Sequence, residues 1–213
     1  MYLPRHFEAP SALAVTELVR LHPLGTLITL DAQGDPVTNE VPFLRVSTPD
    51  GPDLLLGHVA RANVVWQEHP IGRAVRVVFK GPDAYISPNW YPTKLEHGRA
   101  VPTWNYTVVQ ASGRLTLLRP GSAELRTVLH QLTTEHEATQ PHPWSMDDAP
   151  PEYIDSMLNA VVGLRVEVQQ WVGKWKTSQN QPAANRAGIN QGLRGQPTCR
   201  SHEAMIRLIE SSQ

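Results

Sequence analysis

Leu164-Arg165-Val166-Glu167-Val168-Gln169 alternates apolar and polar side chains along its whole length. Because successive side chains of a strand point to opposite faces, this pattern predicts a half-buried β-strand. The segment Lys174-Trp175-Lys176-Thr177-Ser178-Gln179-Asn180 follows and combines two cations, an indole ring and short polar side chains. Such a segment can neutralise an anion, stack on a flat ring and donate hydrogen bonds. The same residues are also typical of a polar strand end around one buried tryptophan, and both interpretations stay open.

Short strand patterns recur along the rest of the chain. We expect strands at residues 26–30, 37–46, 54–56, 74–79, 84–86 and 106–118. We expect helices at about 11–21 and 60–68, after Ser122, after Pro150-Pro151, and around Met205 to Ile209. Residues 87–102 are rich in proline without periodicity, which predicts a long loop. Many short strands and few long helices predict a mainly β (α+β) fold, a β-barrel with peripheral helices.

Composition excludes several classes of protein. The 213 residues carry a net charge of −1, so the chain lacks the basic balance of a dedicated DNA-binding protein. The single cysteine, Cys199, excludes an intramolecular disulfide and a cysteine-rich metal site. The histidines show no metal-ligand spacing, so we expect no metal. No apolar run is long enough for a signal core or a membrane span, and we expect a soluble, cytoplasmic protein.

Gly57-His58-Val59-Ala60-Arg61-Ala62-Asn63 lies where an expected strand ends and an expected helix begins. Backbone N–H groups at a helix N-terminus stabilise an anion. Arg61 can add a bidentate fork to a phosphate, and His58 or Asn63 can donate further hydrogen bonds. The alternative is that Arg61 is a solvated surface residue and Asn63 a local cap.

Aromatic residues gather in and around the long loop. They are Tyr85, Trp90, Tyr91, Trp104 and Tyr106. Aromatic faces stack on flat heterocycles, which favours a binding site. A hydrophobic cluster that pins the loop and a dimer contact are the alternatives that these residues leave open.

Several separate motifs together resemble the PaiB family over about residues 1–195. They are Met1-Tyr2-Leu3-Pro4-Arg5-His6-Phe7, Gly57 to Asn63, Gly81-Pro82-Asp83-Ala84-Tyr85-Ile86-Ser87-Pro88-Asn89-Trp90-Tyr91, Val101-Pro102-Thr103-Trp104-Asn105-Tyr106, and Lys174 to Asn180. The resemblance implies an FMN-binding split β-barrel domain over residues 1–195 with a C-terminal helical extension over 196–213. It also implies a homodimer with FMN at the subunit interface.

The resemblance also assigns site residues. Arg61 would hold the FMN phosphate, with His58 and Asn63 assisting. The segments Thr26 to Thr29 and Asn39 to Pro42 would run along the ring system, through Thr26, Thr29, Asn39, Val41 and Pro42. The residues that would close the pocket, partly from the partner subunit, are Trp104, Asn105, Lys174, Lys176, Ser178 and Gln179. Asn39-Glu40 departs from the family pattern where a histidine is expected, so we expect Glu40 to point away or to pair with a cation.

The resemblance implies a negative transcriptional regulator, with DNA as a partner on the resemblance alone. The alternative is a flavin-dependent oxidoreductase that acts on a small molecule, because fold does not fix function. A scaffold protein with an empty pocket is a third reading. The sequence assigns no catalytic residue.

Overall fold

The computed structural model describes residues 1–48, 51–68, 72–197 and 199–211. Within these ranges, seven strands form one open antiparallel sheet, in the order β2-β1-β5-β6-β7-β4-β3. The strands are β1 (Leu24–Leu30), β2 (Pro36–Pro42), β3 (Leu44–Val46), β4 (Leu54–Ala60), β5 (Ala74–Ile86), β6 (Thr103–Leu118) and β7 (Val161–Lys176). The predicted mainly β fold of the split-barrel type, with peripheral helices, is confirmed.

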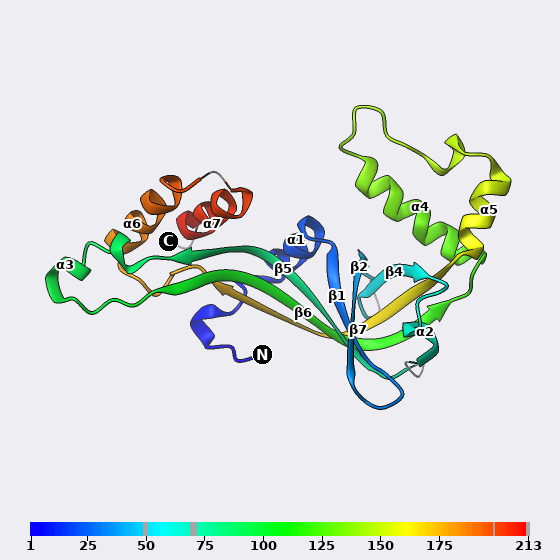
Figure 1. The fold of residues 1–213 in the computed structure, drawn as a ribbon, viewed down its shortest axis with the longest axis horizontal. Helices are drawn as coiled ribbons and strands as arrows, with labels where there is room; N and C mark the ends of the chain where they lie inside the picture. Colours follow the sequence, from blue (N-terminus) through cyan, green and yellow to red (C-terminus); the bar gives the residue numbers. More distant parts are fainter. Residues whose placement is uncertain (49–50, 69–71, 198, 212–213) are drawn as a thin grey trace. The chain divides into compact units, whose positions relative to one another are not determined.

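The helices are α1 (Ala12–Leu21), α2 (Val65–Glu68), α3 (Lys94–His97), α4 (Ala123–Glu137), α5 (Pro151–Asn159), α6 (Ala183–Arg194) and α7 (Arg200–Ser211) (Figure 1). The chain divides into two compact units. Unit 1 comprises residues 1–18, 80–109 and 172–213, and unit 2 comprises residues 19–79 and 110–171. The boundary expected at residue 195 stays a prediction. No helix in the described ranges is both long and apolar enough to cross a membrane.

Unit 2 holds the β1–β2 hairpin and the pairing of β4 with β3 and β7. Asp31 stabilises the hairpin turn by accepting from the N–H groups of Gln33 and Asp35, at 2.9 and 2.8 Å. β2 and β3 are the two edge strands of the hydrogen-bonded sheet. β2 nevertheless also lies close to β4. A Cβ at Gly57 would lie 2.8 Å from Val41 Cγ1, so the glycine permits this close approach.

One apolar cluster of unit 2 joins α4 and α5 to the sheet. Ser122 caps α4 by accepting from the Leu125 N–H at 3.2 Å, as its position before the apolar periodicity predicts. Leu125 and Val128 pack with Leu158 of α5 against Leu118 of β6. Burying large aliphatic side chains stabilises a fold by about 1.5–3 kcal/mol each, so this cluster holds both helices on the sheet.

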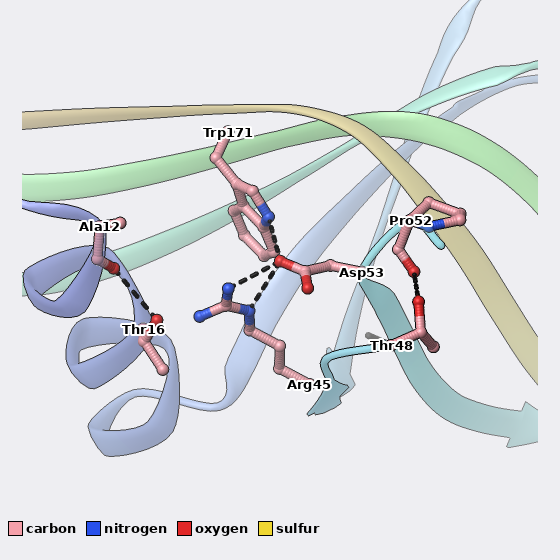
Figure 2. Close-up of polar contacts among 7 residues, drawn as sticks. All are labelled: Ala12, Thr16, Arg45, Thr48, Pro52, Asp53 and Trp171. Atoms are coloured by element: carbon pink, nitrogen blue, oxygen red, sulfur yellow. Dashed lines mark hydrogen bonds and ion pairs between the residues drawn. The ribbon is translucent and has the colours of Figure 1, made fainter. Parts of the chain in front are cut away.

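A polar cluster in unit 2 ties β3, β4 and β7 together (Figure 2). The Asp53 carboxylate accepts from Arg45 Nη2 at 2.6 Å and from Trp171 Nε1 at 2.8 Å. The Arg45 guanidinium also lies 5.0 Å from the centre of the Trp171 ring. Burial alone raises the pKa of Asp53, but the hydrogen bonds from Arg45 and Trp171 outweigh it and hold the pKa below its ordinary value.

Unit 1 contains the first part of α1, up to residue 18, and the helix pair α6 and α7, which lie side by side (Figure 1). Ser11 caps α1 through its Oγ, which accepts from the Ala14 N–H at 3.1 Å. Ile189 of α6 and Met205 of α7 are buried with Ile86 of β5 in one cluster. Ser201 of α7 covers the edge of β5, because its hydroxyl bonds to both the N–H and the C=O of Asp83.

Three expectations about elements are wrong. The strand expected over 37–46 is two strands, because the chain leaves β2 at Pro42, which has no N–H to donate, and the Phe43 N–H turns to the Pro23 carbonyl at 2.9 Å. The helix expected over 60–68 begins only at Val65, because β4 continues to Ala60 in its ladder with β7. The strands expected over 74–79 and 84–86 are one strand, β5.

Further helical elements were not expected. The long loop contains α3 and a 3-10 turn at Pro88–Trp90, and the polar stretch after residue 180 contains α6. Gly188 and Gly192 of α6 lie against Trp90, and a Cβ at either glycine would collide with it. Glycine disfavours helix formation, so Gly188 and Gly192 weaken the sequence signal for α6. The same two glycines let α6 pack against Trp90.

Candidate functional site

The residues that sequence analysis selects fall into two groups, one in each unit. The group in unit 2 consists of Thr26, Thr29, Asn39, Val41, Pro42, His58, Arg61 and Asn63. The group in unit 1 consists of Trp104, Asn105, Lys174, Lys176, Ser178 and Gln179. Each group has its own geometry.

Asn63 connects the loop after β4 to β2. Its Nδ2 donates to Asn39 Oδ1 at 2.7 Å, and its Oδ1 accepts from the Val65 N–H at 2.9 Å. One side chain thereby joins two of the selected positions and also caps the short helix α2. Asn63 thus acts as a local cap, and its expected hydrogen bond to a phosphate stays a prediction.

Arg61 lies in the turn after β4 and its side chain is exposed. Its backbone N–H donates to the Ala160 carbonyl at 2.8 Å, and its Nη1 is 3.5 Å from the Asn159 carbonyl oxygen. Because α2 begins only at Val65, Arg61 is not at a helix N-terminus, and that part of the expectation is corrected. Any affinity for an anion at this position comes from the guanidinium itself.

His58 of β4 carries a buried ring nitrogen. Its Nδ1 has no hydrogen-bond partner among the described residues. Burial lowers the pKa of His58, so the ring is neutral at pH 7. A buried polar atom without a partner costs free energy, which a ligand atom that bonds to it would recover.

The β1–β2 hairpin carries the remaining residues of this group. Thr26 Oγ1 donates to the two Glu40 carboxylate oxygens at 2.8 and 3.1 Å, since the two residues face each other in register. Glu40 is therefore held by a neutral hydroxyl. Thr29 and Val41 are buried in the sheet, and Pro42 is half-buried.

In unit 1, Asn105 and Ser178 form a buried reciprocal pair. Asn105 Nδ2 donates to Ser178 Oγ at 2.9 Å, and Ser178 Oγ lies 3.2 Å from Asn105 Oδ1. Ser178 adopts a φ of 61°, in the left-handed region that residues other than glycine rarely occupy. The structure therefore joins two positions that are far apart in sequence and holds one of them in a strained conformation.

The two lysines of the segment 174–180 have different surroundings. Lys174 Nζ is enclosed by the rings of Tyr2, Phe7 and Tyr106 and donates to the Tyr2 carbonyl at 3.1 Å. Lys176 Nζ donates to Thr103 Oγ1 and to the Trp104 carbonyl. Lys174 therefore faces the N-terminal segment, and Lys176 faces the start of β6.

The pKa of Lys176 is lowered, chiefly by burial. The Tyr106 phenol opposes this shift, and the charge of Lys174 adds to it. Gln179 braces the same segment, because its Nε2 donates to the carbonyls of His6 and Trp175, at 2.9 and 2.6 Å. The indole of Trp104 is exposed and meets Tyr85 edge to face at 5.9 Å.

A cavity of about 380 Å³ opens in unit 1 and is lined by Asn105, Lys176 and Ser178. Tyr91, one of the aromatic residues singled out in the long loop, also lines it. Sequence reasoning missed other residues of its lining, which include Thr93, His97, Arg99 and Asn185. The long loop was singled out for its aromatic residues, while its basic residues went unremarked. In the described ranges, no group of three or more His, Cys, Asp or Glu residues is placed to hold a metal ion.

The chain is similar in sequence to a family model and to several known proteins. A family model described as "Putative FMN-binding domain" matches residues 1–170. Protease synthase and sporulation protein PAI 2 of Bacillus subtilis is 29% identical over 99% of this chain and 97% of its own length. An uncharacterized protein of Aspergillus fumigatus is 30% identical over 91% of this chain and 90% of its own length.

Solved structures share the fold at low sequence identity. The flavocytochrome Anf3 from Azotobacter vinelandii aligns with a TM-score of 0.60 and 12% identity, over 82% of this chain and 72% of its own. The FAD and heme binding protein from Mycobacterium smegmatis aligns with a TM-score of 0.55 and 15% identity, over 93% of this chain and 96% of its own. At these identities the likeness concerns the fold alone.

Proposed function

Since this chain belongs to the family of FMN-binding domains, of the PaiB type, we propose that it is a homodimeric flavoprotein that acts as a negative transcriptional regulator. FMN is the cofactor of the family. The regulatory role rests on the resemblance to the PaiB family. A cytoplasmic location, inferred from the sequence, belongs to the same proposal.

The residues present suit a flavin mononucleotide. In unit 2, the exposed Arg61 guanidinium suits a phosphate, and the unpaired buried Nδ1 of His58 suits a polar ligand atom. Asn39 and Asn63, joined by a hydrogen bond, offer amide groups in the same unit. This grouping, in a chain of this family, is the observation that carries the proposal. The resemblance to the PaiB family also assigns Asn105, Lys176 and Ser178 of unit 1 to the flavin, in part from the partner subunit.

The bound flavin would supply electron or hydride transfer. The chain would bind its phosphate through Arg61 and orient its ring through the β1–β2 hairpin. Lys176 would place a cation near the ring, which favours an anionic reduced flavin. The burial that lowers its pKa also strengthens its interaction with a nearby negative charge.

Substitution of Arg61 tests the binding part of this proposal. We expect Arg61→Gln to weaken FMN binding by at least about tenfold, because charge-assisted hydrogen bonds to a phosphate contribute about 1.5–3 kcal/mol. Quenching of FMN fluorescence measures the affinity. Arg126→Gln is the matched control, since Arg126 is an exposed arginine of unit 2 paired with Asp155 on α5. Equal affinities for the two variants would remove Arg61 from the site.

An electrophoretic shift titrated against salt tests the regulatory part. Direct DNA binding predicts a shift that weakens steeply as salt rises, because released counterions dominate such affinity. Unchanged mobility at low salt would contradict direct DNA binding. Light scattering tests the homodimer, and a mass of one chain at micromolar concentration would contradict it.

A flavin-dependent oxidoreductase is the second candidate, and the cavity beside Lys176 favours it because that cavity can hold a small molecule. This reading predicts that a nicotinamide donor bleaches the bound flavin without air and that turnover continues in air. A flavin that stays oxidised under these conditions would exclude nicotinamide-driven turnover.

A further inference from the structure

The cavity in unit 1 has walls from four parts of the chain. They are the 87–102 loop with α3, the start of β6, the end of β7 and the start of α6. Its volume of about 380 Å³ falls at the lower end of the range for small-molecule sites, about 300–1,000 Å³. It is therefore large enough for a small metabolite.

The charged side chains of the cavity lining are all basic. Lys176 and Arg99 line it together with His97, and its described lining contains no Asp or Glu. Lys176 Nζ is bonded only to neutral oxygens among the contacts described for it, those of Thr103 and Trp104. The positive charge of Lys176 is thus not neutralised by these contacts. A cavity lined by positive charge attracts anions.

The walls of the cavity are held by hydrogen bonds. Asn185 Oδ1 accepts from the Thr93 hydroxyl at 3.0 Å, which ties α6 to the loop. The buried pair of Asn105 and Ser178 ties β6 to the segment after β7 in the same way. His97 Nδ1 accepts from the Arg99 N–H at 3.0 Å, so a neutral His97 ring carries its proton on Nε2 and can donate it. Donors fixed before a ligand arrives bind it at a lower entropic cost.

We propose that this cavity binds a small oxyanion, the phosphate or carboxylate group of a metabolite, at a site separate from the FMN phosphate. Arg99 and Lys176 supply the charge, and His97 Nε2 and the second Nδ2 hydrogen of Asn185 supply neutral hydrogen bonds. The site goes beyond the proposed function. Its specific residues, Arg99 and His97, are not among those assigned to the flavin.

The test is isothermal titration of the FMN-loaded protein with inorganic phosphate and, in a second arm, with acetate. We expect saturable binding of one or both anions, weakened about tenfold by Arg99→Gln through the loss of a charged hydrogen-bond donor. Arg194→Gln is the matched control, because Arg194 is an exposed arginine of unit 1 paired with Glu210 and lies outside the cavity lining. Arg99 is exposed, so its replacement should leave the unfolding midpoint unchanged.

Equal affinity of wild type and Arg99→Gln for both anions, or no binding of either, would overturn the proposal. Phosphate binding that disappears when FMN is loaded would also overturn it, because the cavity would then be the place of the FMN phosphate. A protein that takes up no FMN but binds phosphate in an Arg99-dependent manner would refute the flavin function and support the oxyanion site.

Discussion

The resemblance assigns Lys174 to the flavin pocket, and the structure places its ammonium against aromatic rings. Its ammonium lies 5.4–6.0 Å from the centres of three aromatic rings, two of them in the N-terminal segment. Such contacts stabilise a buried cation by about 1–2 kcal/mol. The backbone next to it holds the same segment, since the Ala9 N–H donates to the Gly173 carbonyl at 3.0 Å. Lys174 is thus an anchor for the N-terminal segment in this structure.

Ser178 offers a test of strain at the candidate site. We expect Ser178→Ala to lower the free energy of unfolding by about 1–3 kcal/mol, because it leaves the buried Asn105 amide without its partner. Ser178→Gly loses the same bond but relieves the positive φ, a gain of about 1 kcal/mol. Urea unfolding should therefore rank the glycine variant above the alanine variant. The reverse order would contradict the strained conformation.

His58 predicts a pH dependence of stability. Burial holds its folded pKa below the unfolded value of about 6.5, so the unfolded chain binds the proton first as the pH falls. The free energy of unfolding should therefore decrease as the pH drops through the window below about 6.5, and His22 acts in the same direction. His58→Gln should make this decrease shallower when flavin-free protein is unfolded in urea at a series of pH values. An unchanged slope would contradict a buried neutral His58.

At the scale of elements, a strong local periodicity was enough to predict a strand or a helix. Features that depend on the close approach of segments distant in sequence were not predicted. The alternation at 164–169 and the Ser122 cap predicted parts of β7 and α4 from local chemistry alone. The split of 37–46 into β2 and β3 depends on which strands lie beside them, and α6 depends on its contact with Trp90. These features arise from residues distant in sequence, which a local pattern does not contain.

In the candidate site, too, some residues were selected from local sequence and others become apparent only in the fold. The hydrogen bond between Asn63 and Asn39 joins two of the selected positions, and the flavin-binding roles expected for residues 58–63 and 174–180 stay predictions. The basic lining of the cavity, Arg99 and His97, was missed because these residues stand in a segment without a regular pattern. Only the fold brings that segment to Lys176.

Gly57 tests the approach of β2 to β4. Gly57→Ala would place a Cβ 2.8 Å from Val41 Cγ1 and 2.9 Å from the Pro42 backbone oxygen, which cannot move freely. We expect a loss of about 1–3 kcal/mol in unfolding free energy, the usual cost of overpacking. Gly195→Ala is the control, because its Cβ would meet no atom closer than 3.5 Å. Equal stabilities of the two variants in urea would contradict the close approach.

At the scale of the whole molecule, the residues assigned to the flavin lie in both units, and each unit presents its own polar group. Arg61 and His58 belong to unit 2, and Lys176 belongs to unit 1. A homodimer offers two copies of each group, so a site can draw its residues from both subunits. The net charge of −1 gives the molecule no general attraction for DNA, and a regulator of this kind would need a local basic surface or a protein partner.

The visible absorption spectrum of the protein after equimolar FMN has been added and unbound flavin removed by gel filtration tests the central claim most directly. We predict that flavin absorbance elutes with the protein at about one FMN per chain, since each chain carries one copy of the Arg61 group. Flavin that elutes entirely with the small molecules, from protein that remains folded, would contradict the claim that this chain is an FMN-binding protein.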